Sequence, residues 1–237
     1  MHVARTGLIV MTCLAAVCCS PPERNEARVA EAAPAAAPPV VPTSAPKEDT
    51  RKPIVVFGDS LTEGGLDTKT SYTDFLQRSI DDKKLPFRVI NMGISGDTTT
   101  GGLARMQSAV AMNPKIVILE LGGNDGLRGI PVSATKSNLE RMITAFQKPG
   151  VQVVLAGMTL PPNYGKEYIE SFERMYYDLA KRHELVFIPF LLEGIRQKLA
   201  TTPGLMNTDG IHPTAKGNEI VGKTVMDRIE PLLRHSR

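Results

Sequence analysis

Short apolar runs alternate with segments of helical periodicity over most of the chain. From Pro53 onward the apolar runs are bounded by polar or glycine-rich turns, which is typical of strands buried on both faces of a parallel sheet. The predicted strands cover residues 53–57, 87–91, 115–121, 151–157 and 185–189. The predicted helices cover residues 70–82, 99–112, 134–148, 163–182 and 191–200, and a last helix runs from Pro213 to about Leu233.

Strands and helices that alternate in this way require crossover connections and a sheet covered on both faces. We therefore predict an α/β fold: a single three-layer α/β/α sandwich of the flavodoxin-like type, with a mainly parallel sheet of about five strands. The domain is expected to span residues 53–237, which is long enough for one hydrophobic core. Its reactive side chains should gather where the strands end, at the carboxyl edge of the sheet.

The first 52 residues differ from the rest in composition. Arg5 precedes a short apolar run over residues 8–17, which is too short to span a bilayer and is typical of a secretory signal. We predict a signal peptide over residues 1–19 and export to a bacterial envelope. The pair Cys18-Cys19 follows the run directly, so lipid attachment to either cysteine and simple periplasmic secretion remain equal alternatives. Residues 20–52 are rich in Pro and Ala, and we predict a disordered linker there.

Composition excludes several classes of function. All three cysteines lie within the first nineteen residues, so a thiol nucleophile, a thiolate metal site or a disulfide scaffold is not expected in the domain. The histidines are too few and too scattered for a metal centre, and no metal or cofactor is predicted. Lys and Arg number 28 against 25 Asp and Glu, and Trp is absent, which gives no reason to expect nucleic acid as a partner. We expect a monomer.

Three polar turns follow the first three predicted strands: residues 58–60, 93–97 and 122–125. A late Asp209-x-x-His212 segment adds an acid and an imidazole. A serine esterase needs a nucleophile, a base, a group that orients the base, and donors for the developing oxyanion. Ser60, His212 and Asp209 can fill the first three roles in that order. The donors would be the backbone N–H groups of Ser60 and Gly93 and the side-chain amide of Asn124, while Asp97 is predicted to cap the next helix.

Five ordered segments resemble the GDSL, or SGNH, hydrolase superfamily, and most closely its branch of bacterial thioesterase I, arylesterase and lysophospholipase L1. The segments are G-D-S-L-T-E-G (58–64), N-M-G-I-S-G-D-T-T-T-G-G-L-A-R (91–105), L-E-L-G-G-N-D-G-L-R-G (119–129), L-P-P-N-Y-G (160–165) and D-G-I-H-P-T-A-K-G (209–217). The resemblance covers roughly residues 53–230 and implies the same five roles. It also places Pro161, Asn163 and Tyr164 beside an acyl groove, as weaker candidates for substrate contact. Asp59 is a further weak candidate, although bracing of the turn is its more natural role.

The resemblance implies a serine hydrolase of carboxylic esters and thioesters, with small-molecule or lipid esters as substrates. One departure is residues 62–65, Thr-Glu-Gly-Gly, where the branch usually carries smaller residues and an aromatic, so the acyl-chain preference stays open. A carbohydrate acetylesterase of the same superfamily and a non-catalytic envelope lipoprotein are the alternatives. Residues 217–224 also match the phosphate-loop pattern G-x-x-x-x-G-K-[ST]. No predicted strand precedes them, as that loop requires, so helix packing is the better interpretation.

Overall fold

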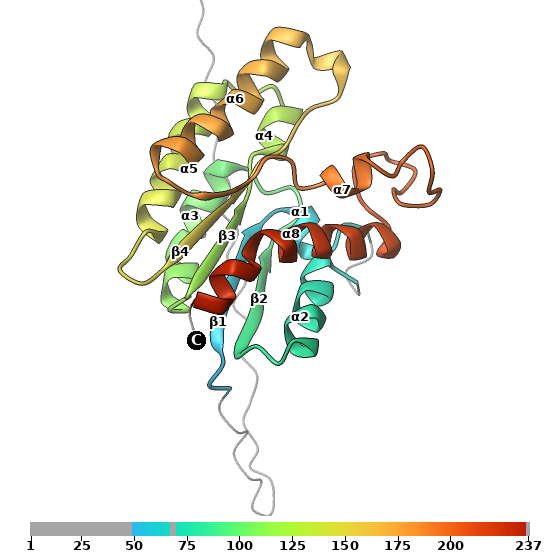
Figure 1. Cartoon of the computed structure of the whole chain (residues 1–237). Coiled ribbons are helices and arrows are strands. Elements are labelled where there is room, and N and C mark those ends of the chain that lie inside the picture. Colours follow the sequence, from blue (N-terminus) through green and yellow to red (C-terminus); the bar gives the residue numbers. More distant parts are fainter. Residues whose placement is uncertain (1–48, 67–69, 236–237) are drawn as a thin grey trace, which may run out of the picture. The chain divides into compact units, whose positions relative to one another are not determined.

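The computed structural model describes residues 49–66 and 70–235. This part of the chain contains a five-stranded, fully parallel sheet and the helices that cover it (Figure 1). The strands lie in the order β2-β1-β3-β4-β5. Their bounds are Lys52–Gly58 (β1), Phe87–Gly93 (β2), Ile116–Glu120 (β3), Gln152–Ala156 (β4) and Val186–Ile188 (β5). The predicted fold class and strand count are confirmed.

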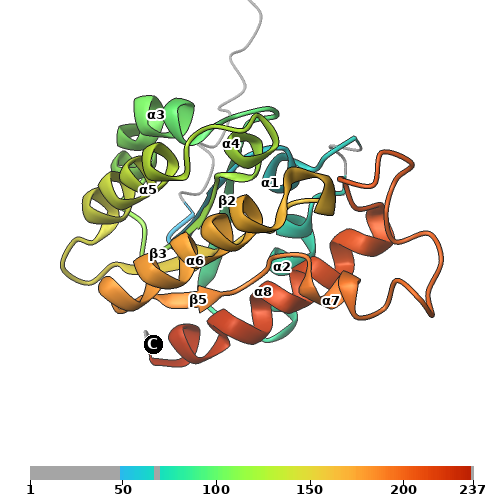
Figure 2. The ribbon, with the colours of Figure 1, turned by 90° about the horizontal axis from the view of Figure 1, so that it is seen from above.

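The described helices are of two kinds: α1, α4 and α7 have four or five residues, and the others have eleven or more. Their bounds are Ser60–Glu63 (α1), Tyr72–Asp82 (α2), Thr99–Ala111 (α3), Gly123–Leu127 (α4), Val132–Phe146 (α5), Lys166–Arg182 (α6), Glu193–Arg196 (α7) and Ala215–His235 (α8), with a 3-10 turn at Pro162–Tyr164 (η1). Figure 2 shows α3 and α5 on one side of the strands and α2 and α8 on the other.

Alternation along the strands produces two separate cores, because successive side chains of a strand point to opposite faces. In β1, Ile54 and Val56 pack with the core under α2 and α8. Val55 and Phe57 pack with the core under α3, α5 and α6. All four side chains are fully buried. The sheet is therefore the middle layer of three, as its continuous apolar strands predict.

The register of β1 with its neighbours β2 and β3 brings three turns to one place. Gly58 at the end of β1 pairs with Gly93 of β2 on one side and with Glu120 of β3 on the other. The chain after each of these positions therefore leaves the sheet at the same level of the carboxyl edge. Asp59 and Ser60 follow from β1, and the Gly122–Asn124 turn follows from β3.

The helix predicted over residues 191–200 is wrong in length. The structure keeps only α7, and residues 197–201 continue as turns. Leu191, Leu192 and Ile195 are buried, whereas Leu199 is 52% exposed. The apolar face therefore ends after one turn, and nothing beyond it holds a helix against the core.

Candidate active site

The candidate nucleophile lies on a sharp turn between β1 and α1. Asp59 is the N-cap of α1, and its Oδ1 accepts a hydrogen bond from the Leu61 N–H at 3.0 Å. Ser60 is the first residue of the helix and is half-buried. The turn is crowded: a Cβ at Gly58 would lie 2.1 Å from Thr62 Oγ1 and 2.4 Å from Glu120 Oε2. Only glycine fits at that position.

Ser60, His212 and Asp209 form a continuous hydrogen-bonded relay. Ser60 Oγ lies 2.8 Å from His212 Nε2, and His212 Nδ1 lies 2.7 Å from Asp209 Oδ2. The second oxygen of Asp209 accepts the backbone N–H groups of Ile211 and His212, at 2.9 and 3.0 Å. The structure therefore brings the three residues together in the order expected for nucleophile, base and orienting acid.

Asp209 is held as a carboxylate. Partial burial raises its pKa, but the hydrogen bonds from the backbone and imidazole of His212 and from Ile211 outweigh burial and lower the pKa to about 2. An ionised acceptor at Oδ2 fixes the proton of the neutral imidazole on Nδ1. Nε2 is then free to accept the proton of the Ser60 hydroxyl.

Two of the three predicted oxyanion donors, the Ser60 N–H and the Asn124 side-chain amide, have an N–H available for a substrate oxygen. The Ser60 N–H belongs to the first turn of α1, where N–H groups have no partner within the helix. Asn124 lies on α4, and its amide donates one hydrogen bond to Asp59 Oδ2 at 3.1 Å. Because an amide carries two N–H bonds, the second remains for a substrate oxygen.

Gly93 differs from these two donors. Its N–H donates to Asn91 Oδ1 at 2.9 Å, so a role in the oxyanion hole requires that this N–H be shared. Gly93 also packs against α1, because a Cβ there would lie 2.1 Å from the Glu63 nitrogen. A glycine at this position is thus required for close approach, whether or not its N–H binds substrate.

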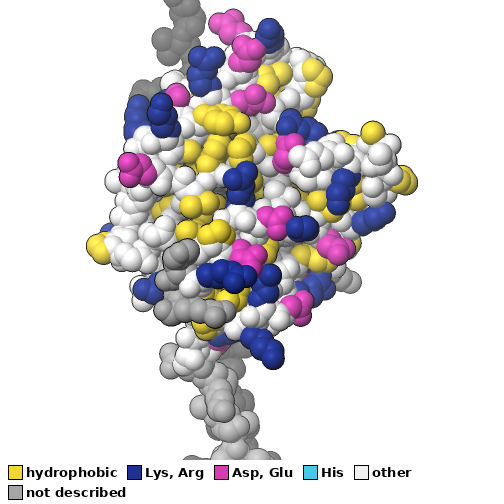
Figure 3. Space-filling model, in the orientation of Figure 1, with side chains coloured by type: hydrophobic (Ala, Val, Ile, Leu, Met, Phe, Trp, Pro, Cys, Tyr) yellow, Lys and Arg dark blue, Asp and Glu magenta, His cyan; other side chains and the backbone are white. Residues whose placement is uncertain are grey.

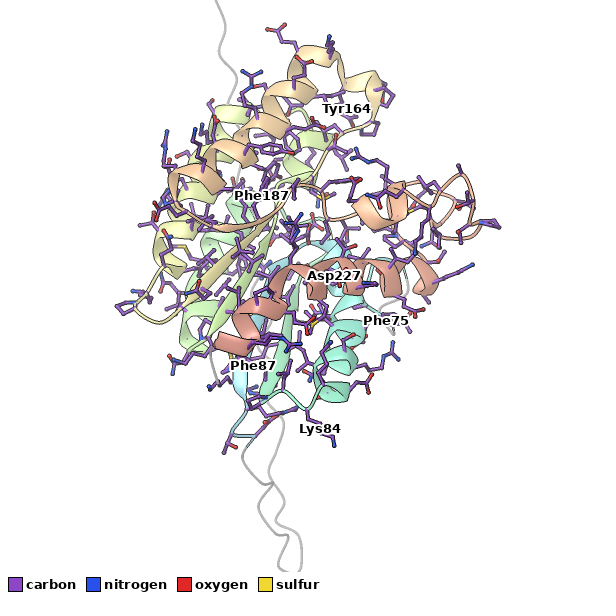
Figure 4. The ribbon with its side chains drawn as sticks, viewed as in Figure 1. Phe75, Lys84, Phe87, Tyr164, Phe187 and Asp227 are labelled. Atoms are coloured by element: carbon purple, nitrogen blue, oxygen red, sulfur yellow. The ribbon has the colours of Figure 1, made fainter. Side chains whose placement is uncertain are left out.

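An apolar groove of about 340 Å³ adjoins the site. Four segments line it: α4, the Asp209–His212 loop, and the segments that follow β4 and β5. The lining residues are Gly123, Leu127, Met158, Thr159, Leu160, Pro161, Phe190, Leu192, Gly210 and Ile211. Pro161 lines the groove, as the resemblance implies. Asn163 and Tyr164 do not line it. The Tyr164 hydroxyl instead donates to the Leu127 carbonyl at 2.8 Å, bracing the turn before α6 (Figure 4).

Comparison with known proteins agrees with this geometry. The sequence profile of the GDSL-like Lipase/Acylhydrolase family matches residues 56–220. The chain belongs to this family. It is 40% identical over 182 residues to esterase TesA of Pseudomonas aeruginosa, covering 76% of this chain and 89% of that protein. It is 32% identical over 184 residues to thioesterase 1/protease 1/lysophospholipase L1 of Escherichia coli K12, covering 77% and 85%. A crystal structure of TesA matches the fold with a TM-score of 0.70 at 39% identity, covering 76% of this chain and 99% of that one.

Within this member of the GDSL-like family, the structure also places a residue that the sequence did not single out. Glu120, at the end of β3, is fully buried beneath the nucleophile turn. Its Oε2 accepts hydrogen bonds from Thr62 Oγ1 at 2.8 Å and from the Asp59 N–H at 3.3 Å. Burial and the neighbouring Asp59 charge raise the pKa of Glu120 well above its usual range. Burial and the nearby carboxylate thus both disfavour the charged form of this side chain.

Asp59 is the second buried carboxyl group at this turn. It is 3% exposed, and both oxygens accept hydrogen bonds from the protein, so the structure gives it no route to a substrate. Burial raises the pKa of Asp59 to about 6, against the hydrogen bonds from Leu61 and Asn124 that lower it. Asp59 is thus ionised at neutral pH and braces the turn.

Arg105 is a second structural residue that the sequence did not indicate. Its guanidinium donates to the Gly58 and Met92 carbonyls, both at 2.8 Å, and forms an ion pair with Asp97 at 2.7 Å. It thereby ties together the ends of β1 and β2. The prediction that Asp97 caps α3 is wrong: Thr98 is the N-cap, because the Asp97 carboxylate is engaged by Arg105.

Residues 62–65, which depart from the usual pattern of the family branch, contact the loop after β2 and the imidazole of His212. The Glu63 carboxylate accepts from the backbone N–H of Ser95 at 2.8 Å and from its hydroxyl, linking α1 to the loop after β2. Gly65 has a φ of +66° and lies against the imidazole of His212, since a Cβ there would be 3.2 Å from His212 Cβ. Absence of a side chain at Gly65 leaves room for the imidazole.

The phosphate-loop pattern lies inside α8, and its glycines serve packing. A Cβ at Gly217 would lie 2.1 Å from the Leu205 carbonyl oxygen, and one at Gly222 would lie 2.7 Å from Phe75 Cβ. Lys223 forms an ion pair with Asp227 one turn later. Figure 4 labels Phe75 on α2 and Asp227 on α8, the two helices that pack together. The pattern is therefore a packing feature of α8.

A surface hollow of about 720 Å³ lies between α2 and α8, and none of the candidate catalytic residues lines it. Its charged lining residues are of both signs: Arg78, Asp82, Lys83, Lys198, Glu219, Lys223, Asp227 and Glu230. Figure 3 shows the same mixture of basic and acidic side chains over this face. The hollow has no single charge that would select an anionic or cationic ligand.

Two findings concern metal binding and membranes. Within residues 49–66 and 70–235, no three His, Cys, Asp or Glu side chains come together as a metal-binding group. The same part of the chain contains no helix that is long and apolar enough to cross a bilayer. The predicted signal peptide, the Cys18 or Cys19 attachment point and nearly all of the predicted linker lie outside the described residues.

Proposed function

We propose that this chain is a serine hydrolase that cleaves carboxylic esters and thioesters through an acyl-Ser60 intermediate. The observation that carries the proposal is the hydrogen-bonded chain Ser60–His212–Asp209, with distances of 2.8 and 2.7 Å, beside an apolar groove that Gly210 and Ile211 help to line. The names of the TesA and thioesterase 1 relatives support the same class of reaction.

The first half-reaction forms the acyl-enzyme. Ser60 Oγ attacks the acyl carbon while His212 Nε2 takes the hydroxyl proton, and Asp209 stabilises the imidazolium. The Ser60 N–H and the Asn124 amide stabilise the oxyanion of the tetrahedral intermediate, with Gly93 as the predicted third donor. The intermediate collapses when His212 donates its proton to the departing alkoxide or thiolate. An alcohol or thiol leaves, and the acyl group stays on Ser60.

The second half-reaction releases the acid. His212 removes a proton from a water molecule, and the resulting hydroxide attacks the acyl carbon of acyl-Ser60. The second tetrahedral intermediate uses the same donors. His212 then returns the proton to Ser60 Oγ, which leaves as the free hydroxyl. The carboxylic acid is released and the enzyme is regenerated without any metal or cofactor taking part in a step.

The groove supports an acyl chain longer than acetyl as the preferred group. Its side chains are mainly aliphatic, with Phe190 as the one aromatic lining residue, so it offers apolar contact to a chain and few stacking surfaces to a sugar. We propose small-molecule or lipid esters as substrates, including aryl esters, acyl thioesters and lysophospholipids. An exported enzyme would meet envelope lipids or scavenged esters more often than acyl-CoA.

A panel of p-nitrophenyl esters from acetate to palmitate, measured with the wild type and Ser60→Ala, tests the proposal. We expect the wild type to prefer a medium chain and Ser60→Ala to lose turnover on every ester. A wild type that hydrolyses acetylated sugars but no medium-chain ester would favour the carbohydrate acetylesterase. A wild type that hydrolyses nothing would favour a binding protein.

We further propose that the protein is exported to a bacterial envelope, as the basic start and the apolar run of residues 8–17 indicate. Intact mass spectrometry of the mature protein distinguishes the forms. A lipid-modified N-terminal cysteine at Cys18 or Cys19 would establish an anchor, a cleaved and unmodified N-terminus would establish secretion, and retention of Met1 would contradict export.

A further inference from the structure

The Asp59 carboxylate joins two parts of the site, α1 after β1 and α4 after β3. Oδ1 accepts the Leu61 N–H of the nucleophile helix, and Oδ2 accepts the side-chain amide of Asn124, 65 residues away in sequence. The group is 3% exposed, so neither contact competes with bulk water. A charged acceptor in a buried position makes a stronger hydrogen bond than a neutral one.

The hydrogen bond from Asn124 to Asp59 determines where the rest of that amide points. The amide is planar, so fixing one N–H on Asp59 Oδ2 fixes the direction of the second N–H. Within residues 49–66 and 70–235, Asp59 is the only side chain hydrogen-bonded to the Asn124 amide. The two residues before Asn124 are Gly122 and Gly123, which offer no side chains to brace the loop.

Glu120 holds the backbone of Asp59. Its Oε2 accepts the Asp59 N–H at 3.3 Å and the Thr62 hydroxyl at 2.8 Å. Thr62 in turn lies 2.9 Å from the buried Tyr72 hydroxyl. Backbone and side chain of Asp59 are therefore both constrained, and the constraint extends from the core to Asn124.

We propose that Asp59, with its peptide held by Glu120, is a positioning residue that orients the Asn124 amide toward the oxyanion. This inference rests on the proposed function, because it assigns Asp59 a role in the oxyanion hole of the same site. Stabilisation of an oxyanion depends on donors that are already in place before charge develops. An Asn124 amide free to rotate would lose that advantage while substrate binding in the groove stayed the same.

Asp59→Asn is the first test. Asn is as good an N-cap as Asp, so the hydrogen bond to Leu61 and the fold should be retained. The Asn side chain has one acceptor oxygen, however, and its NH₂ group would face the Asn124 donor. We expect kcat to fall roughly 10- to 100-fold, with KM changed by less than about threefold. Asp59→Ser also caps the helix but is too short to reach Asn124, and should behave in the same way.

A double-mutant cycle with Asn124→Ala separates positioning from a general structural effect. If Asp59 acts through Asn124, the double variant Asp59→Asn/Asn124→Ala should have a kcat less than about threefold below that of Asn124→Ala alone. Asp125→Asn is the matched control. Asp125 is equally buried on α4, but it accepts from the Thr99 N–H at 2.8 Å and not from Asn124. Any fall in kcat caused by Asp125→Asn should be independent of Asn124, so the fold losses of Asp125→Asn and Asn124→Ala should multiply in the double variant.

The inference is overturned if Asp59→Asn is a folded enzyme within threefold of wild-type kcat, or if its loss multiplies fully with that of Asn124→Ala. Failure of the proposed function gives a different result. In that case the wild type itself would neither hydrolyse p-nitrophenyl esters nor react with an organophosphonate at Ser60.

Discussion

Ser60 Oγ and His212 Nε2 lie 2.8 Å apart although 152 residues separate them. Ser60 follows the inner strand β1, whereas His212 lies in the loop that leads into α8. That loop is closed on itself: Asn207 donates to the His212 carbonyl from both its backbone and its side chain, at 2.8 and 3.1 Å. The packing of α8 against α2 then places the closed loop over the end of β1.

Asp209→Asn should remove the charge that orients His212 and leave the loop in place. The Asn side-chain oxygen can still accept the N–H groups of Ile211 and His212, as Asp209 Oδ1 does. The NH₂ group that replaces Oδ2 would face His212 Nδ1 and favour the wrong tautomer. We expect kcat on a p-nitrophenyl ester to fall by roughly 10⁴ with little change in melting temperature. A loss of less than about tenfold would contradict the role of Asp209.

Gly65→Ala should reduce both stability and turnover. Gly65 has a φ of +66°, and a Cβ would lie 3.2–3.4 Å from the imidazole side chain of His212. The left-handed conformation alone costs a non-glycine residue about 1–2 kcal/mol. Displacement of the imidazole should in addition lower kcat about tenfold, since small misplacements of catalytic groups are costly.

Gly129→Ala is the matched control for that contact. Gly129 has nearly the same φ, +64°, but a Cβ there would meet nothing within 4 Å. Denaturant unfolding should show a similar loss of stability for both variants, while kcat should fall only for Gly65→Ala. Equal kcat values in the two variants would refute the claim that Gly65 makes room for His212.

The periodicity of the chain was sufficient to predict the parallel sheet, because strands buried on both faces are apolar throughout. The nucleophile, base and acid could also be named, since only one histidine lies in a loop beside a suitable acid. Glu120 could not be found in this way. A single glutamate at the end of an apolar strand has no periodic signal, and its burial depends on Thr62 and Tyr72 from other segments.

Strand order and the short helices were also beyond the sequence. The position of β1 between β2 and β3 arises from packing that no local pattern encodes. Helices α1 and α4 have four and five residues, too few to show periodicity. No local pattern marks Arg105 on α3, and only the fold brings it to the Gly58 and Met92 carbonyls.

Glu120→Gln should stabilise the protein increasingly as pH rises. The pKa of Glu120 is raised in the folded state by burial and by the Asp59 charge, so above the unfolded pKa of about 4.3 the folded chain holds more protons than the unfolded chain. The stability of the wild type therefore falls as pH rises from that value through the folded pKa. Glutamine is neutral at every pH and retains an acceptor for Thr62 and the Asp59 N–H.

The measurement is the melting temperature of both proteins between pH 5 and pH 8. We expect the difference between Glu120→Gln and the wild type to grow in favour of the variant across this range. A constant difference, or one that shrinks with rising pH, would show that Glu120 is ionised in the folded protein.

The most direct test of the account is stoichiometric reaction of the wild type with an organophosphonate, followed by peptide mass spectrometry. The account predicts one phosphonyl group per chain on Ser60, loss of ester hydrolysis in proportion to labelling, and no labelling in Ser60→Ala. Labelling of a different residue, or hydrolysis that survives complete modification of Ser60, would contradict it.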